Sequence, residues 1–127
     1  MTTYYLASTY GRRVELAGYA DQLRADGHDI TARWLAGEHE AIDQTADRNT
    51  QALWATEDIE DICAATNFLL FTDGQPGRGG KDVELGIAIA TGKRITLIGP
   101  FTNVFTFRHS IRQYDTFQDY WDRELSA

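Results

Sequence analysis

Two short, predominantly apolar runs, FLLF at 68–71 and ITLI at 95–98, constrain the fold of this chain most strongly. A strand that is apolar on both faces must be covered on both faces, which is typical of a parallel sheet enclosed by helices. Apolar residues at helical spacing precede and separate these runs. The sequence therefore predicts alternating strands and helices joined by parallel crossovers.

The expected elements follow from these periodicities and from the Gly, Pro and Asp clusters between them. We expect strands at residues 4–8, 28–34, 67–72, 94–99 and 111–114, and helices at 14–25, 46–65, 82–91 and from about 117. The inner face of the second helix is assigned to Leu53, Trp54, Ile59, Ile62 and Cys63. The fold class is α/β: a single three-layer domain over residues 1–127, with a mainly parallel sheet of four to five strands flanked by helices, of the Rossmann or flavodoxin-like type.

Charge and cysteine content limit the possible partners. The net charge of −7 argues against a nucleic-acid polymer as ligand, because such a groove needs clustered Lys and Arg. The lone Cys63 makes no internal disulfide, and neither a signal peptide nor a membrane span of roughly 20 apolar residues is visible. We therefore expect a cytoplasmic protein without a membrane partner, and the three scattered histidines indicate no metal site.

Polar loops follow the first, third and fourth strands. Because ligands of parallel sheets bind beyond the carboxyl ends of the strands, residues 8–13, 73–84 and 99–103 are expected to meet at one edge. The segment GRGGKDVELGIAIATGKR at 77–94 places Gly79 and Gly80 before a helix, where free amide groups favour an anion. Glu84 is the only charged residue between Asp82 and Lys93. It either complements the helix dipole or serves a reaction at the crevice, since burying an idle carboxylate is costly.

Three segments resemble the nucleoside 2-deoxyribosyltransferases and the related hydrolases of nucleotide N-glycosidic bonds. They are YYLAST at 4–9, DIEDICAATNFLLF at 58–71 and GGKDVELGIAIATGKRITLIGP at 79–100, and the tail after Phe101 matches weakly. The resemblance implies an enzyme that cleaves or transfers the N-glycosidic bond of a deoxynucleoside or its 5′-monophosphate. It also implies a small-molecule partner, no metal or redox cofactor, and a homodimer or higher homo-oligomer.

The resemblance assigns roles residue by residue. Glu84 would be the nucleophile that forms a glycosyl ester, and an ordinary glutamate is ionised at neutral pH as that role requires. Asp58 would hold the sugar or the nucleophile, or else be a solvated helix carboxylate. Tyr5 fits the family tyrosine better than Tyr4, and strand alternation points the two to opposite faces, with core packing as the alternative for either.

Phosphate binding is assigned to the loops at the strand ends. Ser8, Gly11 and Arg13 correspond to the phosphate-gripping loop of the nucleotide hydrolases, although Arg12 and Arg13 also suit a solvated helix start. Arg78 stands where the transferases have an aspartate that protonates the leaving base, so the acid would be Asp73, Asp82 or a group of another subunit. The further binding candidates are Gly79, Gly80 and Asn103.

Two alternative functions stay open at this point. Arg78 in place of the aspartate supports a nucleotide-binding module that has lost turnover. Related chemistry at C1′ also supports cleavage of the nicotinamide bond of NAD. The base, the phosphate requirement and the choice between transfer and hydrolysis are not determined by these residues.

Overall fold

The computed structural model describes residues 2–37, 47–74 and 79–126. Its centre is a sheet of five strands in the order β2-β1-β3-β4-β5, in which every neighbouring pair is parallel. The strands are β1 (Thr3–Ala7), β2 (Asp29–Ile30), β3 (Asn67–Phe71), β4 (Arg94–Ile98) and β5 (Arg112–Tyr114). This order is that of flavodoxin-like doubly wound sheets, whose ligand crevice lies between β1 and β3, where the chain reverses its direction of winding.

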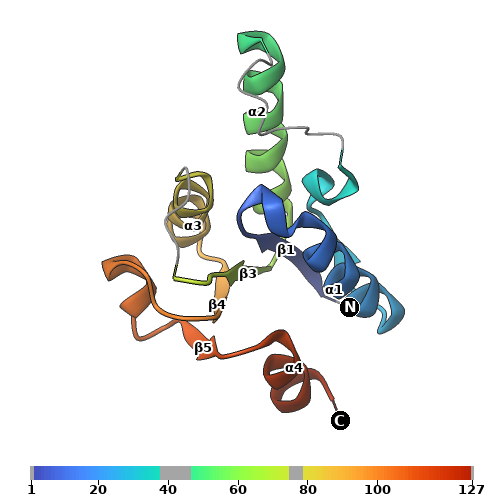
Figure 1. The fold of residues 1–127 in the computed structure, drawn as a ribbon, viewed down its shortest axis with the longest axis vertical. Helices are drawn as coiled ribbons and strands as arrows, with labels where there is room; N and C mark the ends of the chain where they lie inside the picture. Colours follow the sequence, from blue (N-terminus) through green and yellow to red (C-terminus); the bar gives the residue numbers. More distant parts are fainter. Residues whose placement is uncertain (1, 38–46, 75–78, 127) are drawn as a thin grey trace.

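Helices cover both faces of the sheet. They are α1 (Arg13–Ala25), α2 (Arg48–Ala64), α3 (Gly80–Ala90) and α4 (Phe117–Tyr120), with short helical segments η1 (Tyr10–Arg12), η2 (Arg33–Ala36), η3 (Val104–Phe107) and η4 (Trp121–Leu125). Figure 1 shows α2 and α3 on one side of the row of strands and α1 and α4 on the other. The Tyr19 ring of α1 stacks on Phe117 of α4, with centroids 4.4 Å apart. The expected α/β class with a parallel sheet between helices is confirmed.

The predicted strand at 28–34 is wrong in its second half, because β2 ends at Ile30 and Arg33–Ala36 form η2. The backbone N–H of Arg33 donates to the Asp61 carboxylate at 2.8 Å, so this group is not available to a strand ladder. The Trp34 indole turns inward and donates to the Leu6 carbonyl at 2.9 Å. Tertiary hydrogen bonds thus replace strand pairing at this position.

The predicted inner face of α2 is confirmed for Trp54 and Ile62 and wrong for Leu53, Ile59 and Cys63. Leu53 and Ile59 are 56% and 46% exposed, and Cys63 is exposed, whereas Ile62 is fully buried. The side of α2 that faces inward carries Trp54, Asp58, Asp61 and Ile62, of which Trp54 and Asp58 line a pocket. Because Asp58 and Asp61 stand in the middle of this face, the spacing of apolar residues alone does not identify it.

The carboxyl ends of β3 and β4 approach each other closely at Gly99. The backbone N–H of Thr72 donates to the Ile98 carbonyl at 2.9 Å, and the Thr72 hydroxyl donates to the Pro100 carbonyl at 2.6 Å. Gly99, between these two acceptors, has φ +119°, a conformation that residues with a Cβ rarely adopt. The chain leaves the sheet here and continues to η3 and β5.

No helix in the described ranges combines the length and the apolar character that a bilayer-spanning segment requires.

Candidate active site

A pocket of about 370 Å³ opens at the carboxyl ends of the strands, between the loop after β1 and the first turns of α3. The residues that line it come from segments far apart in the sequence. They are Ser8, Tyr10, Trp34, Gln51, Trp54, Ala55, Asp58, Gly80, Lys81 and Glu84. This is the crevice where doubly wound sheets bind their ligands.

Helix α3 carries Glu84 into this pocket. Gly79 precedes the helix with φ +96°, a left-handed conformation that suits glycine, and α3 begins two residues earlier than predicted. Leu85 and Ala88 are 1% and 0% exposed and fix α3 in the core. Glu84 and Lys81 lie one turn apart, so both side chains point to the pocket.

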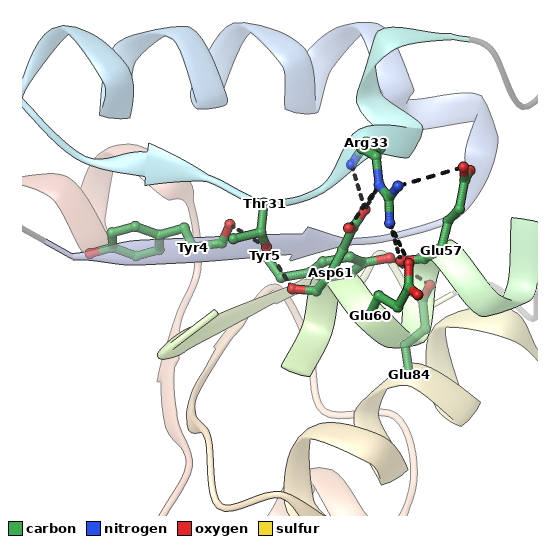
Figure 2. A network of polar contacts seen from close by, with 8 residues as sticks. All are labelled: Tyr4, Tyr5, Thr31, Arg33, Glu57, Glu60, Asp61 and Glu84. Atoms are coloured by element: carbon green, nitrogen blue, oxygen red, sulfur yellow. Dashed lines mark hydrogen bonds and ion pairs between the residues drawn. The ribbon is translucent and has the colours of Figure 1, made fainter. Parts of the chain in front are cut away.

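Tyr5 of β1 contacts Glu84 at the pocket. Its hydroxyl donates to Oε2 of Glu84 at 2.7 Å, and the ring, stacked on Phe68, is fully buried. Tyr4 extends in the opposite direction, as Figure 2 shows, and its hydroxyl lies 2.9 Å from that of Tyr120. The alternation of the strand thus separates the two tyrosines, and Tyr5 is the one beside the nucleophile candidate.

Asp58 of α2 supplies a second carboxyl group at Glu84, within hydrogen-bonding reach. An ion-pair network anchors α2 one turn further along (Figure 2): Arg33 Nε donates to Asp61 at 2.9 Å and its Nη2 donates to Glu60 at 2.9 Å. The Thr31 hydroxyl donates to the Asp61 carbonyl at 2.7 Å. These contacts fix the rotation of α2 and therefore the direction of Asp58.

The environment of Glu84 changes its acidity. Burial, followed by the neighbouring Asp58, raises the pKa of Glu84 to about 8, although the hydrogen bond from Tyr5 acts in the opposite direction. The expectation of an ordinary, fully ionised Glu84 is therefore wrong. Two carboxyl groups this close titrate as a unit, and near neutral pH they share a proton.

This raised pKa predicts how stability depends on pH. The pKa of Glu84 is about 8 in the folded protein and near its ordinary 4.5 after unfolding, so the folded state holds its proton more tightly. The stabilisation from this group is complete below pH about 4.5 and is lost as pH rises toward 8. We expect the free energy of unfolding of the wild type, relative to Glu84→Gln, to fall between pH 5 and 8 in urea titrations. A difference that stays constant over this range would contradict the shift.

The first loop places its candidates differently. Ser8 lines the pocket, and its hydroxyl donates to the Phe71 carbonyl at 3.0 Å. Gly11 of η1 is exposed and is not among the described residues that line the pocket. The Arg13 guanidinium lies against Gly37 and donates to the Leu35 carbonyl at 3.0 Å. The structure therefore brings Ser8 to the pocket but directs Arg13 toward η2.

The remaining candidates lie near α3 or beyond the described residues. Gly80 lines the pocket and Gly79 caps its helix, whereas Arg78 lies outside the described residues. The Asn103 amide donates to Asp82 at 3.2 Å, beside a separate, mostly apolar pocket of about 340 Å³. Neither Asp73 nor Asp82 is among the described residues that line the Glu84 pocket.

Sequence reasoning missed Lys81 as a site residue. Lys81 is only 7% exposed, and it lines the same pocket as Glu84. The spacing of three residues on a helix was the available signal, because positions i and i+3 share a face. The aromatic residues Tyr10, Trp34 and Trp54 also form part of the wall.

The fold matches those of solved structures. A 2-deoxyribosyltransferase from Bacillus psychrosaccharolyticus aligns with a TM-score of 0.75 and 20% identity, over 97% of this chain and 93% of that chain. A CMP N-glycosidase from Clostridium botulinum aligns with a TM-score of 0.56 and 20% identity, over 94% and 96% of the two chains. A conserved protein from Enterococcus faecalis V583 aligns with a TM-score of 0.54 and 24% identity, over 77% of this chain and 63% of that chain.

No protein-family model matches the sequence, and no curated protein matches it. At identities this low the similarity concerns the backbone, and it extends over nearly the whole chain for the first two structures. The chain therefore has the fold shared by the 2-deoxyribosyltransferase and the CMP N-glycosidase.

Proposed function

We propose that this protein is an enzyme that cleaves the N-glycosidic bond of a deoxynucleoside or its 5′-monophosphate through a glycosyl ester on Glu84. The observation that carries the proposal is the contact set of Glu84, which faces a ligand-sized pocket, accepts the Tyr5 hydroxyl at 2.7 Å and adjoins Asp58. A nucleophilic carboxylate with a neighbouring acid is the arrangement that glycosidic bond cleavage with a covalent intermediate requires.

The first step uses the proton that the two carboxyl groups share. The raised pKa of Glu84 keeps a proton in the pocket near neutral pH. In the reactive arrangement this proton has moved to Asp58, so Glu84 is ionised and the Tyr5 hydroxyl stabilises its charge. A Glu84 oxygen bonds to C1′ while the bond from C1′ to the base nitrogen breaks, and the electron pair leaves with the base. Asp58 donates its proton to the departing base. Asp58 thereby supplies the acid that Arg78 does not provide.

The second step releases the sugar. Water attacks C1′, its proton returns to Asp58, and the ester electrons return to Glu84. A second base in place of water would give a new nucleoside by the same route. Hydrolysis and transfer therefore differ only in which acceptor reaches the ester.

The aromatic wall supports a nucleobase as the leaving group. Tyr10, Trp34 and Trp54 come from η1, η2 and α2 and line the same pocket as the first turns of α3. The Trp34 ring is 6% exposed and is held by its bond to the Leu6 carbonyl, so its orientation is fixed. Flat aromatic surfaces of this kind bind bases by stacking.

The names of the structural neighbours support the same chemistry. One is a 2-deoxyribosyltransferase and another a CMP N-glycosidase, and both act at the bond between a sugar and a base. The first is named as a transferase and the second as a glycosidase, and this chain shares the fold of both. The homo-oligomer expected from the sequence stays a prediction.

The test is incubation with the four common deoxynucleosides and their 5′-monophosphates, followed by chromatography for free base. We expect base release from at least one of them, and a protein mass increased by one deoxyribosyl group after rapid acid quenching. A second base added to the mixture distinguishes transfer from hydrolysis through formation of a new nucleoside. Saturable binding without base release would instead support the silent nucleotide-binding module. Nicotinamide released from NAD, with the deoxynucleosides untouched, would support the glycohydrolase alternative.

A further inference from the structure

Lys81 is a largely buried cation with no side-chain partner in the described part of the chain. Its side chain is 7% exposed, and it makes no hydrogen bond or ion pair with any described residue. The ammonium nitrogen itself is not among the fully buried polar atoms, so it reaches the open space of the pocket. A partly desolvated ammonium group gains free energy when an anion compensates it. A lysine kept in this state at a pocket wall is therefore placed to meet an anion that arrives from solution.

Glu84 lines the same pocket, and among the described residues no ion pair joins it to Lys81. Glu84 is instead held by Tyr5 and Asp58. The pocket thus separates an acidic part at Glu84 from a basic part at Lys81, one helical turn toward the start of α3.

The start of α3 strengthens the basic part. Gly79 and Gly80 open the helix without a side-chain cap, so amide groups of the first turn have no side-chain acceptor. Such amide groups together with the helix dipole bind phosphate. Arg13, the arginine expected to bind phosphate, points to the Leu35 carbonyl, so Lys81 is the buried cation that the described pocket offers.

We propose that Lys81 binds the 5′-phosphate of a nucleoside monophosphate and thereby selects the nucleotide over the nucleoside. The inference rests on the proposed function, because Glu84 fixes where C1′ must lie. With the base on the aromatic residues and C1′ at Glu84, the sugar directs its 5′ substituent to the remaining polar wall. Side chains one turn apart on a helix lie about 5–6 Å apart at Cβ, which is the scale of a deoxyribose ring and its 5′ carbon. An ammonium and a phosphate form a charge-assisted hydrogen bond that a neutral 5′-hydroxyl does not provide.

The experiment measures binding as well as turnover. Trp34 and Trp54 line the pocket, so tryptophan fluorescence reports occupancy without chemistry. Each of the four common deoxynucleoside 5′-monophosphates is titrated beside its deoxynucleoside. Wild type, Lys81→Met, Lys81→Arg and Lys93→Met are compared. The chain has only two lysines, and Lys93 donates to the Cys63 carbonyl at 2.7 Å outside the pocket, so Lys93→Met is the matched control.

We expect wild type to bind the preferred nucleotide about 10- to 100-fold more tightly than its nucleoside, as a hydrogen bond to a charged group provides. Lys81→Met should remove most of this difference without weakening nucleoside binding, and Lys81→Arg should retain much of it. Lys93→Met should behave as wild type. Inorganic phosphate should compete with the nucleotide in wild type and not in Lys81→Met.

Two results would overturn the assignment: equal affinity of wild type for nucleotide and nucleoside, or a preference that Lys81→Met leaves intact. Thermal unfolding checks that the variant is folded. We expect no large loss of stability, because methionine keeps most of the side-chain volume and Lys81 makes no hydrogen bond or ion pair with a described residue. The two proposals fail separately. Base release without discrimination by Lys81 rejects the lysine role alone, and nucleotide discrimination without base release rejects the catalytic proposal alone.

Discussion

Glu84→Gln is expected to reduce the rate of base release by about a thousandfold or more, as the loss of a covalent nucleophile does in other enzymes. The amide keeps the shape of the side chain and an oxygen that accepts the Tyr5 hydroxyl bond, which is 2.7 Å in the wild type. It removes the carboxylate that attacks C1′ and the proton shared with Asp58. Free base measured by chromatography at saturating substrate gives kcat for the variant.

The control is Glu60→Gln on α2. Glu60 is exposed and accepts a hydrogen bond from Arg33 at 2.9 Å, away from the lining of the pocket. This substitution should leave kcat within about twofold, because exposed ion pairs contribute little. The glycosyl adduct should appear in the mass spectrum of Glu60→Gln and be missing from that of Glu84→Gln. Base release by Glu84→Gln at the wild-type rate would remove the nucleophile from the mechanism.

Gly99→Ala is expected to destabilise the fold by about 3–5 kcal/mol. An added Cβ would lie 2.7 Å from the Thr72 hydroxyl oxygen and closer still to the Thr72 carbonyl oxygen, which belongs to the backbone. The φ of +119° adds strain for any residue with a Cβ. Relief of the clash would break the bonds that join β3, β4 and β5 here, including the bond from the Gly99 N–H to the Tyr114 carbonyl at 2.8 Å. Urea unfolding at constant pH measures the loss.

Gly18→Ala in α1 is the matched substitution. No atom lies within 4 Å of a Cβ built at Gly18, and the residue is exposed within a helix. It should stabilise the protein by about 0.5–1 kcal/mol, because alanine loses less conformational freedom than glycine in a helix. Equal stability of Gly99→Ala and wild type would mean that the β3–β4 junction relaxes without cost.

The elements that the sequence predicted well are those with a clear periodicity. Residues 67–71 and 94–98 form strands, as their predominantly apolar runs predict, and α3 starts at Gly80, close to the predicted position. The errors arose where a polar side chain outweighed the local pattern. The Asp61 carboxylate accepts a hydrogen bond from the backbone N–H of Arg33, so β2 ends earlier than predicted. Asp58 and Asp61 lie on the inner side of α2, where apolar residues were expected.

The candidate site divides in the same manner. The alternation of β1 was enough to separate Tyr5 from Tyr4, and the position of Glu84 beyond a strand end was visible in its motif. The direction of Arg13 toward Leu35, the burial of Lys81 and the raised pKa of Glu84 were not visible. Each depends on which groups from other segments surround the side chain, and local spacing carries no such information.

The sequence by itself determined the parallel α/β sheet, the loops that meet at its edge and the acid that opens α3, because short-range periodicity and strand order fix them. Only the tertiary structure decided the charge state of the pocket. Desolvation and the approach of Asp58 from α2 raise the pKa of Glu84 to about 8, and packing leaves Lys81 buried without a partner among the described residues. Both effects are energies of burial and proximity between distant segments, which exist only once the chain has folded.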